Sequence, residues 1–181
     1  MSKPHLGSNY LLDAYPRKDW AGHSDMGGVA RFWLHKHDSF RSLGGRLKGL
    51  SAGFLDNKKD LREMHSKFLY PLNEYISNLH GHHSIEDQHY FPLFRRLEPR
   101  LKKGFTLLEG DHDVVHETIT KIVKDWQNIA NRKNDPQFDS KVMTVGFAEI
   151  VRDFIVKVDI HLTDEEDLVI PVLLKHKDRS L

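Results

Sequence analysis

The sequence contains one short pattern twice, once near its middle and once near its carboxyl end. Each copy has a histidine, a glutamate four residues later and a proline six residues after that glutamate: His82, Glu86 and Pro92, then His161, Glu165 and Pro171. Residues four apart lie on the same face of a helix. The repeat therefore predicts two helices that each present an imidazole beside a carboxylate, an arrangement suited to holding a metal ion.

Four segments have the apolar spacing of helices that are buried along one side. They cover about 29–54, a stretch beginning near 61 and continuing past 89, about 105–131 and about 140–176. No segment has a convincing strand pattern. The sequence thus predicts an all-α fold, an up-down-up-down four-helix bundle over residues 29–181. Residues 1–28 lack sustained periodicity and are predicted to be an irregular N-terminal arm, packed on the bundle through Tyr10, Leu11, Leu12, Tyr15 and Trp20.

Composition excludes several classes of function. The chain has no cysteine, which removes disulfides, thiolate zinc sites and iron–sulfur clusters. Lys plus Arg number 27 and Asp plus Glu 26, so the net charge of +1 gives no reason to expect nucleic acid or an anionic membrane surface as a partner. No apolar run approaches the roughly 20 residues that span a bilayer. Without the apolar core of a secretion signal at its start, the chain is expected to be cytoplasmic.

The 13 histidines are the unusual feature, and each predicted helix carries at least one on its inner face. A single buried histidine is usually structural. Several imidazoles and two carboxylates buried together would be costly to desolvate without a cation, and neutral imidazole is the commonest protein metal ligand. The inner faces together offer His37, His82, Glu86, His112, His116, His161 and Glu165. His35 lies about 200° around the helix from His37 and is expected to face outward.

This set of residues resembles the hemerythrin-like (HHE cation-binding) domains. The resemblance implies a four-helix bundle that holds two iron ions joined by an oxo or hydroxo bridge. It further implies that Glu86 and Glu165 bridge the two ions. The terminal ligands it implies are His37, His82, His112, His116 and His161.

Two ligand positions stay open within this resemblance. In the oxygen-carrying branch of the family, the last carboxylate falls in the slot of Glu166, whereas the internal repeat favours Glu165. His83 lies three residues before Glu86 and could replace His82, which the repeat again favours. Surplus groups near the site, among them His65 and Tyr90, are expected to support the ligands or lie at the surface.

Two other metal-site patterns fit less of the sequence. The Glu-x-x-His motif of ferritin-like bundles occurs at Glu86–His89 and Glu109–His112, but that interpretation leaves inner-face histidines without a purpose. The segment from His112 to His116 resembles the zinc-protease motif H-E-x-x-H, but Asp113 stands where the general-base glutamate is required.

The mixture of imidazole and carboxylate favours iron, and manganese or zinc could substitute for it. The first functional hypothesis is a protein that binds or senses O2, NO or peroxide, with turnover of peroxide or NO as an extension. The alternative is an iron storage or donation protein. A third hypothesis is a helical bundle in which metal has no function. The N-terminal arm could cap the site, mediate formation of a homodimer or only cover apolar surface.

Overall fold

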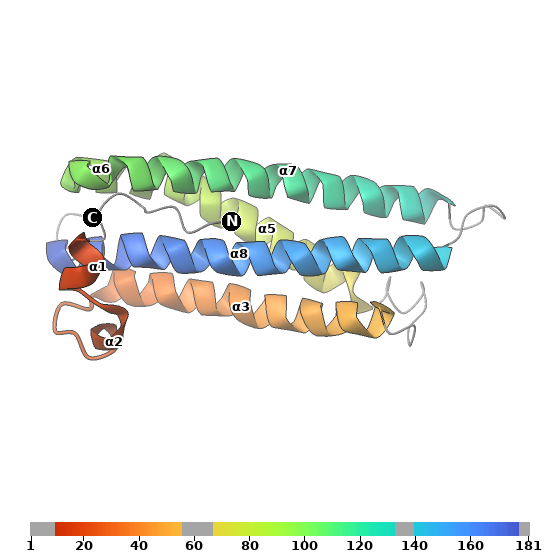
Figure 1. The fold of residues 1–181 in the computed structure, drawn as a ribbon, viewed down its shortest axis with the longest axis horizontal. Helices are drawn as coiled ribbons and strands as arrows, with labels where there is room; N and C mark the ends of the chain where they lie inside the picture. Colours follow the sequence, from red (N-terminus) through yellow and green to blue (C-terminus); the bar gives the residue numbers. More distant parts are fainter. Residues whose placement is uncertain (1–9, 56–66, 133–139, 178–181) are drawn as a thin grey trace. The chain divides into compact units, whose positions relative to one another are not determined.

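The computed structural model describes residues 10–55, 67–132 and 140–177 (Figure 1). Within these ranges the chain is helical and contains no strand. Two short helices, α1 (Tyr10–Ala14) and α2 (Arg17–Trp20), precede the long helix α3 (Gly28–Leu55). Next come α5 (Leu69–Ile85), the π-helix η1 (Glu86–Tyr90), α6 (Phe91–Leu97) and the 3-10 turn η2 (Pro99–Leu101). The chain ends with α7 (Lys102–Arg132) and α8 (Ser140–His176).

The chain is divided into two compact units, and each long helix contributes to both. The first unit comprises Met1–Ser39, Gly81–His112 and Ile160–Leu181, and the second comprises Phe40–His80 and Asp113–Asp159. In each unit, four helical segments that alternate in direction make up the bundle (Figure 1). The predicted all-α helical bundle is confirmed.

The core of the first unit is built from apolar side chains of the arm and of all four bundle segments. Aromatic rings pack together within it: Phe91 and Phe94 from α6 lie against Phe105 from α7, with ring centroids 5.2 and 5.7 Å apart. Leu11 and Trp20 of the arm belong to the same buried cluster. The predicted packing of the arm on the bundle is thus confirmed, and part of the arm is helical. Helices of four or five residues are too short to show periodicity in a sequence.

The second unit has its own aromatic core. The ring of Tyr75 in α5 packs edge-on against Phe40 of α3 and Phe154 of α8. Gly44 of α3 lies close to α8, because a Cβ atom built there would be 2.9 Å from Cγ2 of Ile155. The glycine is therefore required by a close helix approach.

The bounds of α3, α7 and α8 agree with the predicted segments to within a few residues, whereas the predicted start of the second helix near 61 lies outside the described residues. Pro71 stands in the first turn of α5, where its missing N–H matters little. Lys177 ends α8 in a left-handed conformation with φ of 59°, as is common just past a helix end.

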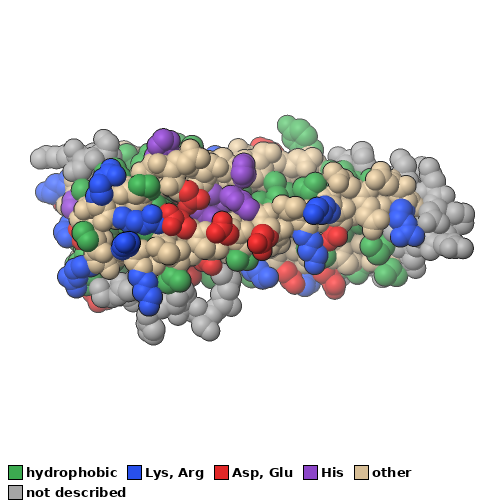
Figure 2. All heavy atoms as spheres, turned by 90° about the horizontal axis from the view of Figure 1, so that it is seen from above, with side chains coloured by type: hydrophobic (Ala, Val, Ile, Leu, Met, Phe, Trp, Pro, Cys, Tyr) green, Lys and Arg blue, Asp and Glu red, His purple; other side chains and the backbone are tan. Residues whose placement is uncertain are grey.

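The face shown in Figure 2 carries basic, acidic and hydrophobic side chains interspersed, with histidine side chains beside acidic ones. None of the helices in the described part of the chain combines the length and hydropathy needed to cross a membrane.

Candidate metal centre

Seven buried or nearly buried side chains form two groups of potential metal ligands in the first unit. One group contains His37, His82, Glu86 and Glu165, and the other contains His83, His112 and His161. Within each group, one ligand atom from every residue lies within 4.8 Å of the others. These residues come from α3, the junction of α5 and η1, α7 and α8.

In the first group, nitrogen and oxygen atoms converge from three of these elements. Nε2 of His37 lies 3.1 Å from Nε2 of His82 and 3.3 Å from Oε1 of Glu165. Nε2 of His82 also lies 2.8 Å from Oε1 of Glu86. Two imidazoles and two carboxylates thus surround one small volume.

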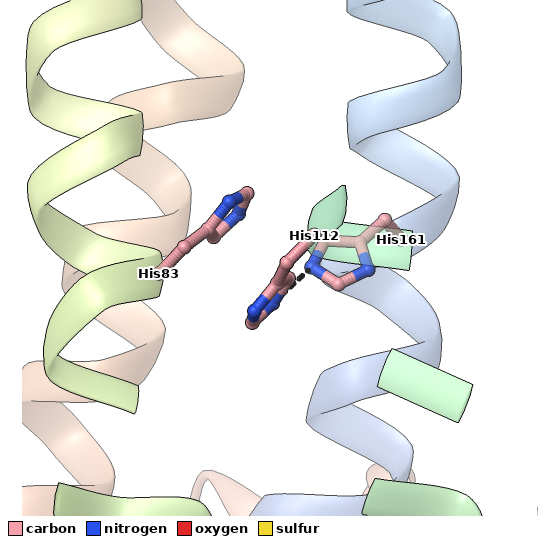
Figure 3. A group of neighbouring side chains, drawn as sticks. All are labelled: His83, His112 and His161. Atoms are coloured by element: carbon pink, nitrogen blue, oxygen red, sulfur yellow. Dashed lines mark hydrogen bonds between the residues drawn. The ribbon is translucent and has the colours of Figure 1, made fainter. Parts of the chain in front are cut away.

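The second group consists of three imidazoles (Figure 3). Nε2 of His112 and Nε2 of His161 are 3.2 Å apart. The ring of His83 stacks on that of His112, with centroids 3.9 Å apart and planes 6° from parallel. The three side chains come from α5, α7 and α8, so no single helix could form this group.

The two carboxylates extend from the first group to the second. The remaining oxygen of Glu86, Oε2, lies 3.7 Å from Nε2 of His112. The remaining oxygen of Glu165, Oε2, lies 3.4 Å from Nε2 of His161. Each carboxylate therefore directs one oxygen to each group, which is the disposition of a ligand shared by two cations.

Outer carboxylates contact the opposite nitrogens of two imidazoles. Oδ1 of Asp87 lies 2.8 Å from Nδ1 of His112, and Oε1 of Glu166 lies 3.0 Å from Nδ1 of His37. A hydrogen-bond acceptor at Nδ1 keeps the proton on that nitrogen and leaves the lone pair of Nε2 available to a metal. Asp87 and Glu166 thus favour the Nδ1-protonated tautomer of His112 and His37.

Two further contacts orient the α8 ligands. Nε1 of Trp33 donates a hydrogen bond of 2.6 Å to Oε1 of Glu165. Oδ2 of Asp111 lies 3.8 Å from Nδ1 of His161, an ion-pair distance when that ring is protonated. The indole therefore fixes the rotation of the Glu165 carboxylate.

The π-helix explains how two adjacent acids serve different purposes. Glu86 opens η1, and one extra residue per turn there widens the helix. Glu86 directs its oxygens toward Nε2 atoms of both groups, whereas its neighbour Asp87 contacts Nδ1 of His112. Pro92 follows in the first turn of α6, where it cannot donate the regular helical hydrogen bond. Such bulges occur frequently at functional sites.

Burial and mutual charge shift the acidities strongly. Burial lowers the pKa of His82 to about 3. Burial, together with the negative charge of Glu165, raises the pKa of Glu86 well above its ordinary value. Burial would raise the pKa of Glu165, but His37 and His161 hold it well below its ordinary value. Burial would lower the pKa of His161, but Asp111 and Glu165 raise it to about 9. The cluster is thus a network of groups that compete for few protons.

The residues present fit a pair of bound cations. Both oxygens of Glu86 and Oε2 of Glu165 are buried and accept no hydrogen bond of normal geometry among the described residues, although imidazole nitrogens lie at ion-pair distances. Buried carboxylate oxygens without hydrogen bonds are costly. Five imidazoles and two carboxylates are also a donor set that suits mid-row divalent metals.

Most of the predicted ligands are brought together. His37, His82, Glu86, His112, His161 and Glu165 all belong to the two groups, and His35 is exposed as expected. His83, predicted only as an alternative to His82, lies in the second group while His82 lies in the first.

The remaining predicted residues have other surroundings. His116 belongs to neither group found among the described residues; it lies in the second unit, where its Nε2 is 3.3 Å from Nδ1 of His80. Tyr90 packs its ring on Trp33, with centroids 5.0 Å apart. His89, the histidine of the Glu-x-x-His motif that begins at Glu86, lies in η1 and is exposed. His65 lies outside the described residues.

The sequence did not assign a supporting contact to Trp33 or Asp111, whereas Glu166 was predicted as a supporting or alternative ligand. The spacing carried one usable signal: Asp87 and Glu166 each directly follow a predicted bridging glutamate.

Comparison with known families agrees with this geometry. A model of the hemerythrin HHE cation-binding domain matches residues 28–144, more than half of the chain. The chain therefore belongs to the hemerythrin HHE cation-binding family. Domains of this family bind metal cations, typically iron, and the His/Glu groups of this chain are compatible with such binding. No curated protein and no solved structure was found to match the chain.

Proposed function

We propose that this protein is a non-haem di-iron protein that binds or senses O2, NO or peroxide inside the bundle. The observation that carries the proposal is the disposition of Glu86 and Glu165, each with one oxygen toward either ligand group. A carboxylate so placed is suited to hold two cations at a short, fixed separation. The ligands would be His37, His82, His83, His112, His161, Glu86 and Glu165.

Two ferrous ions would supply the electrons and open coordination positions that diatomic ligands and peroxide require. The residues of the chain would control their surroundings. Trp33 and Glu166 hold Glu165 and His37 in place, while Phe91, whose ring centroid is 5.5 Å from that of His112, keeps water from one side of the cluster. Asp87 contacts His112 and its side chain is a third exposed, so it lies between the cluster and solvent.

Variants of one bridge and one outward histidine test the proposed site. Glu86→Ala should lower iron content markedly, since both ligand groups lose a shared carboxylate, whereas His35→Ala should leave it unchanged. Elemental mass spectrometry of the purified proteins measures the difference. Equal iron loss in both variants would contradict the proposed site.

The optical spectrum of the loaded protein tests the proposed reactivity. A near-ultraviolet charge-transfer band that appears in air and disappears under vacuum would support reversible O2 binding. Rapid loss of added peroxide, or of NO, would support turnover. Loaded protein whose spectrum responds to none of the three would contradict this proposal.

Iron storage or donation is the second candidate. One observation favours it: His82 retains about a tenth of its side-chain exposure, so the first group has an edge near solvent. Ready transfer of iron to a weak chelator, without a spectral response to O2, NO or peroxide, would favour this candidate over the first.

A further inference from the structure

Arg17 links the N-terminal arm to one turn of α8 beside the metal centre. Its Nη1 lies 2.8 Å from Oε2 of Glu166, its Nε lies 2.5 Å from Oδ1 of Asp167, and its Nη2 donates to the carbonyl of Thr163 at 2.6 Å. Three donors of one guanidinium thus meet three acceptors. This use of the planar fork is something a lysine cannot reproduce.

The acceptor Glu166 connects Arg17 to the ligand cluster. One of its oxygens contacts Arg17, and the other lies 3.0 Å from Nδ1 of His37. Glu166 and His37 are both buried, whereas the Arg17 side chain is 39 % exposed. A continuous chain of polar contacts therefore runs from the surface of the arm to His37, whose Nε2 faces Glu165.

The arm is anchored in the core of the first unit, and Arg17 is held beside that anchor. Trp20 at the end of α2 is buried in the core of the first unit. The guanidinium of Arg17 lies 4.8 Å from the centre of the Trp20 ring, within the range of a cation–π contact. Arg17 therefore starts from an anchored backbone and has little freedom to leave Glu166.

We propose that Arg17 is a positioning residue of the metal centre, which acts through Glu166 to keep Nε2 of His37 directed at the bound ion. The inference rests on the proposed function. Arg17 holds one oxygen of the buried Glu166, so that the other oxygen stays directed at Nδ1 of His37. It also means that the arm, which precedes the family match at 28–144, is part of the metal site of this chain.

The rate at which bound Fe(II) is lost to an excess of a chelator, under anaerobic conditions, measures this effect in the full-length protein. Arg17→Met should speed the loss about tenfold, the lower end of the effect of removing a partner that orients a ligand. Arg17→Lys should restore part of the difference. Lys18→Met, at the next residue of α2 and also exposed, should match the wild type and is the control for damage to the arm.

A double-mutant cycle separates positioning from a structural contribution of the arm. Glu166→Gln should also speed iron loss, and adding Arg17→Met to it should give little further change, because both act along one chain of contacts. Independent multiplication of the two effects would overturn the inference. So would wild-type rates of iron loss in Arg17→Met.

The melting temperatures of the metal-free proteins distinguish a structural role of Arg17 from a positioning role. If Arg17 only fastens the arm, Arg17→Met and Arg17→Lys will lower the melting temperature without changing the rate of iron loss, which overturns the inference but leaves the proposed function intact. A wild-type protein that retains no iron would overturn both.

Discussion

His83 and His116 have the same side chain and contrasting surroundings. His83 is fully buried and stacks on His112, whereas His116 is half-buried beside His80. His83→Ala should therefore lower the iron content to half or less, because one group loses an imidazole, and His116→Ala should leave it near the wild-type value. Elemental mass spectrometry measures both. The reverse order would restore His116 as a ligand, as its spacing from His112 predicts.

Glu98 is separated in the sequence from the metal ligands and makes the stability of the folded protein depend on pH. Only 4 % of it is exposed, and it accepts hydrogen bonds from Tyr10, Lys175 and His176. Burial alone would raise the pKa of Glu98, but these bonds outweigh burial and hold that pKa below its ordinary value. Burial and the Glu98 carboxylate raise the pKa of Tyr10 to about 12, so Tyr10 stays a donor at neutral pH.

A depressed carboxyl pKa stabilises the folded state above the unfolded pKa of about 4.3, and this stability is lost as the pH falls through the lower folded pKa. The melting temperature of the wild type should therefore fall more steeply below about pH 4 than that of Glu98→Gln. Thermal unfolding of both metal-free proteins from pH 7 to pH 3 checks this. Parallel curves would show that the ionised form of Glu98 adds no stability.

Among the elements, α3 offers a matched pair of glycines. Gly44→Ala would place a methyl group 2.9 Å from Ile155, and overpacking of this kind costs roughly 1–3 kcal/mol. Gly45→Ala meets nothing within 4 Å and should stabilise the exposed helix by about 0.5–1 kcal/mol. Chemical denaturation measures both free energies of unfolding. A stabilising Gly44→Ala would mean that α3 can move away from Ile155 at no cost.

The sequence was sufficient to predict the long helices, because each has an apolar stripe that only a helix can bury on one side. It also predicted which of His35 and His37 faces inward, since two residues differ by about 200° around a helix. It did not predict that His82 and His83 would both join the cluster. A regular helix separates adjacent residues by about 100°, and the π-helix that follows has no signature in the apolar spacing.

The supporting contacts were beyond prediction for another reason. Arg17 lies nearly 150 residues from Glu166 in the sequence, and Trp33 lies 132 residues from Glu165. No helical periodicity relates residues so far apart in the sequence, so neither contact could be predicted from it. The internal repeat was enough to include Glu165 among the predicted ligands. Its hydrogen bond from Trp33 depends on the fold, which brings α3 and α8 together.

At the scale of the whole molecule, metal binding should be coupled to folding. Glu86 and Glu165 are buried with hydrogen-bond capacity left over, so the metal-free protein carries a desolvation cost that bound ions would offset. Iron loading should raise the melting temperature, and a strong chelator should reverse the rise. Equal melting temperatures for loaded and metal-free protein, measured by circular dichroism, would contradict this coupling.

The count of ferrous ions bound per chain tests the central claim most directly. Anaerobic titration of the metal-free protein with Fe(II), with bound iron measured after removal of the excess, should reach two ions per chain, one for each ligand group spanned by Glu86 and Glu165. A plateau at one ion, or no retained iron, would contradict the account of two cations joined by shared carboxylates.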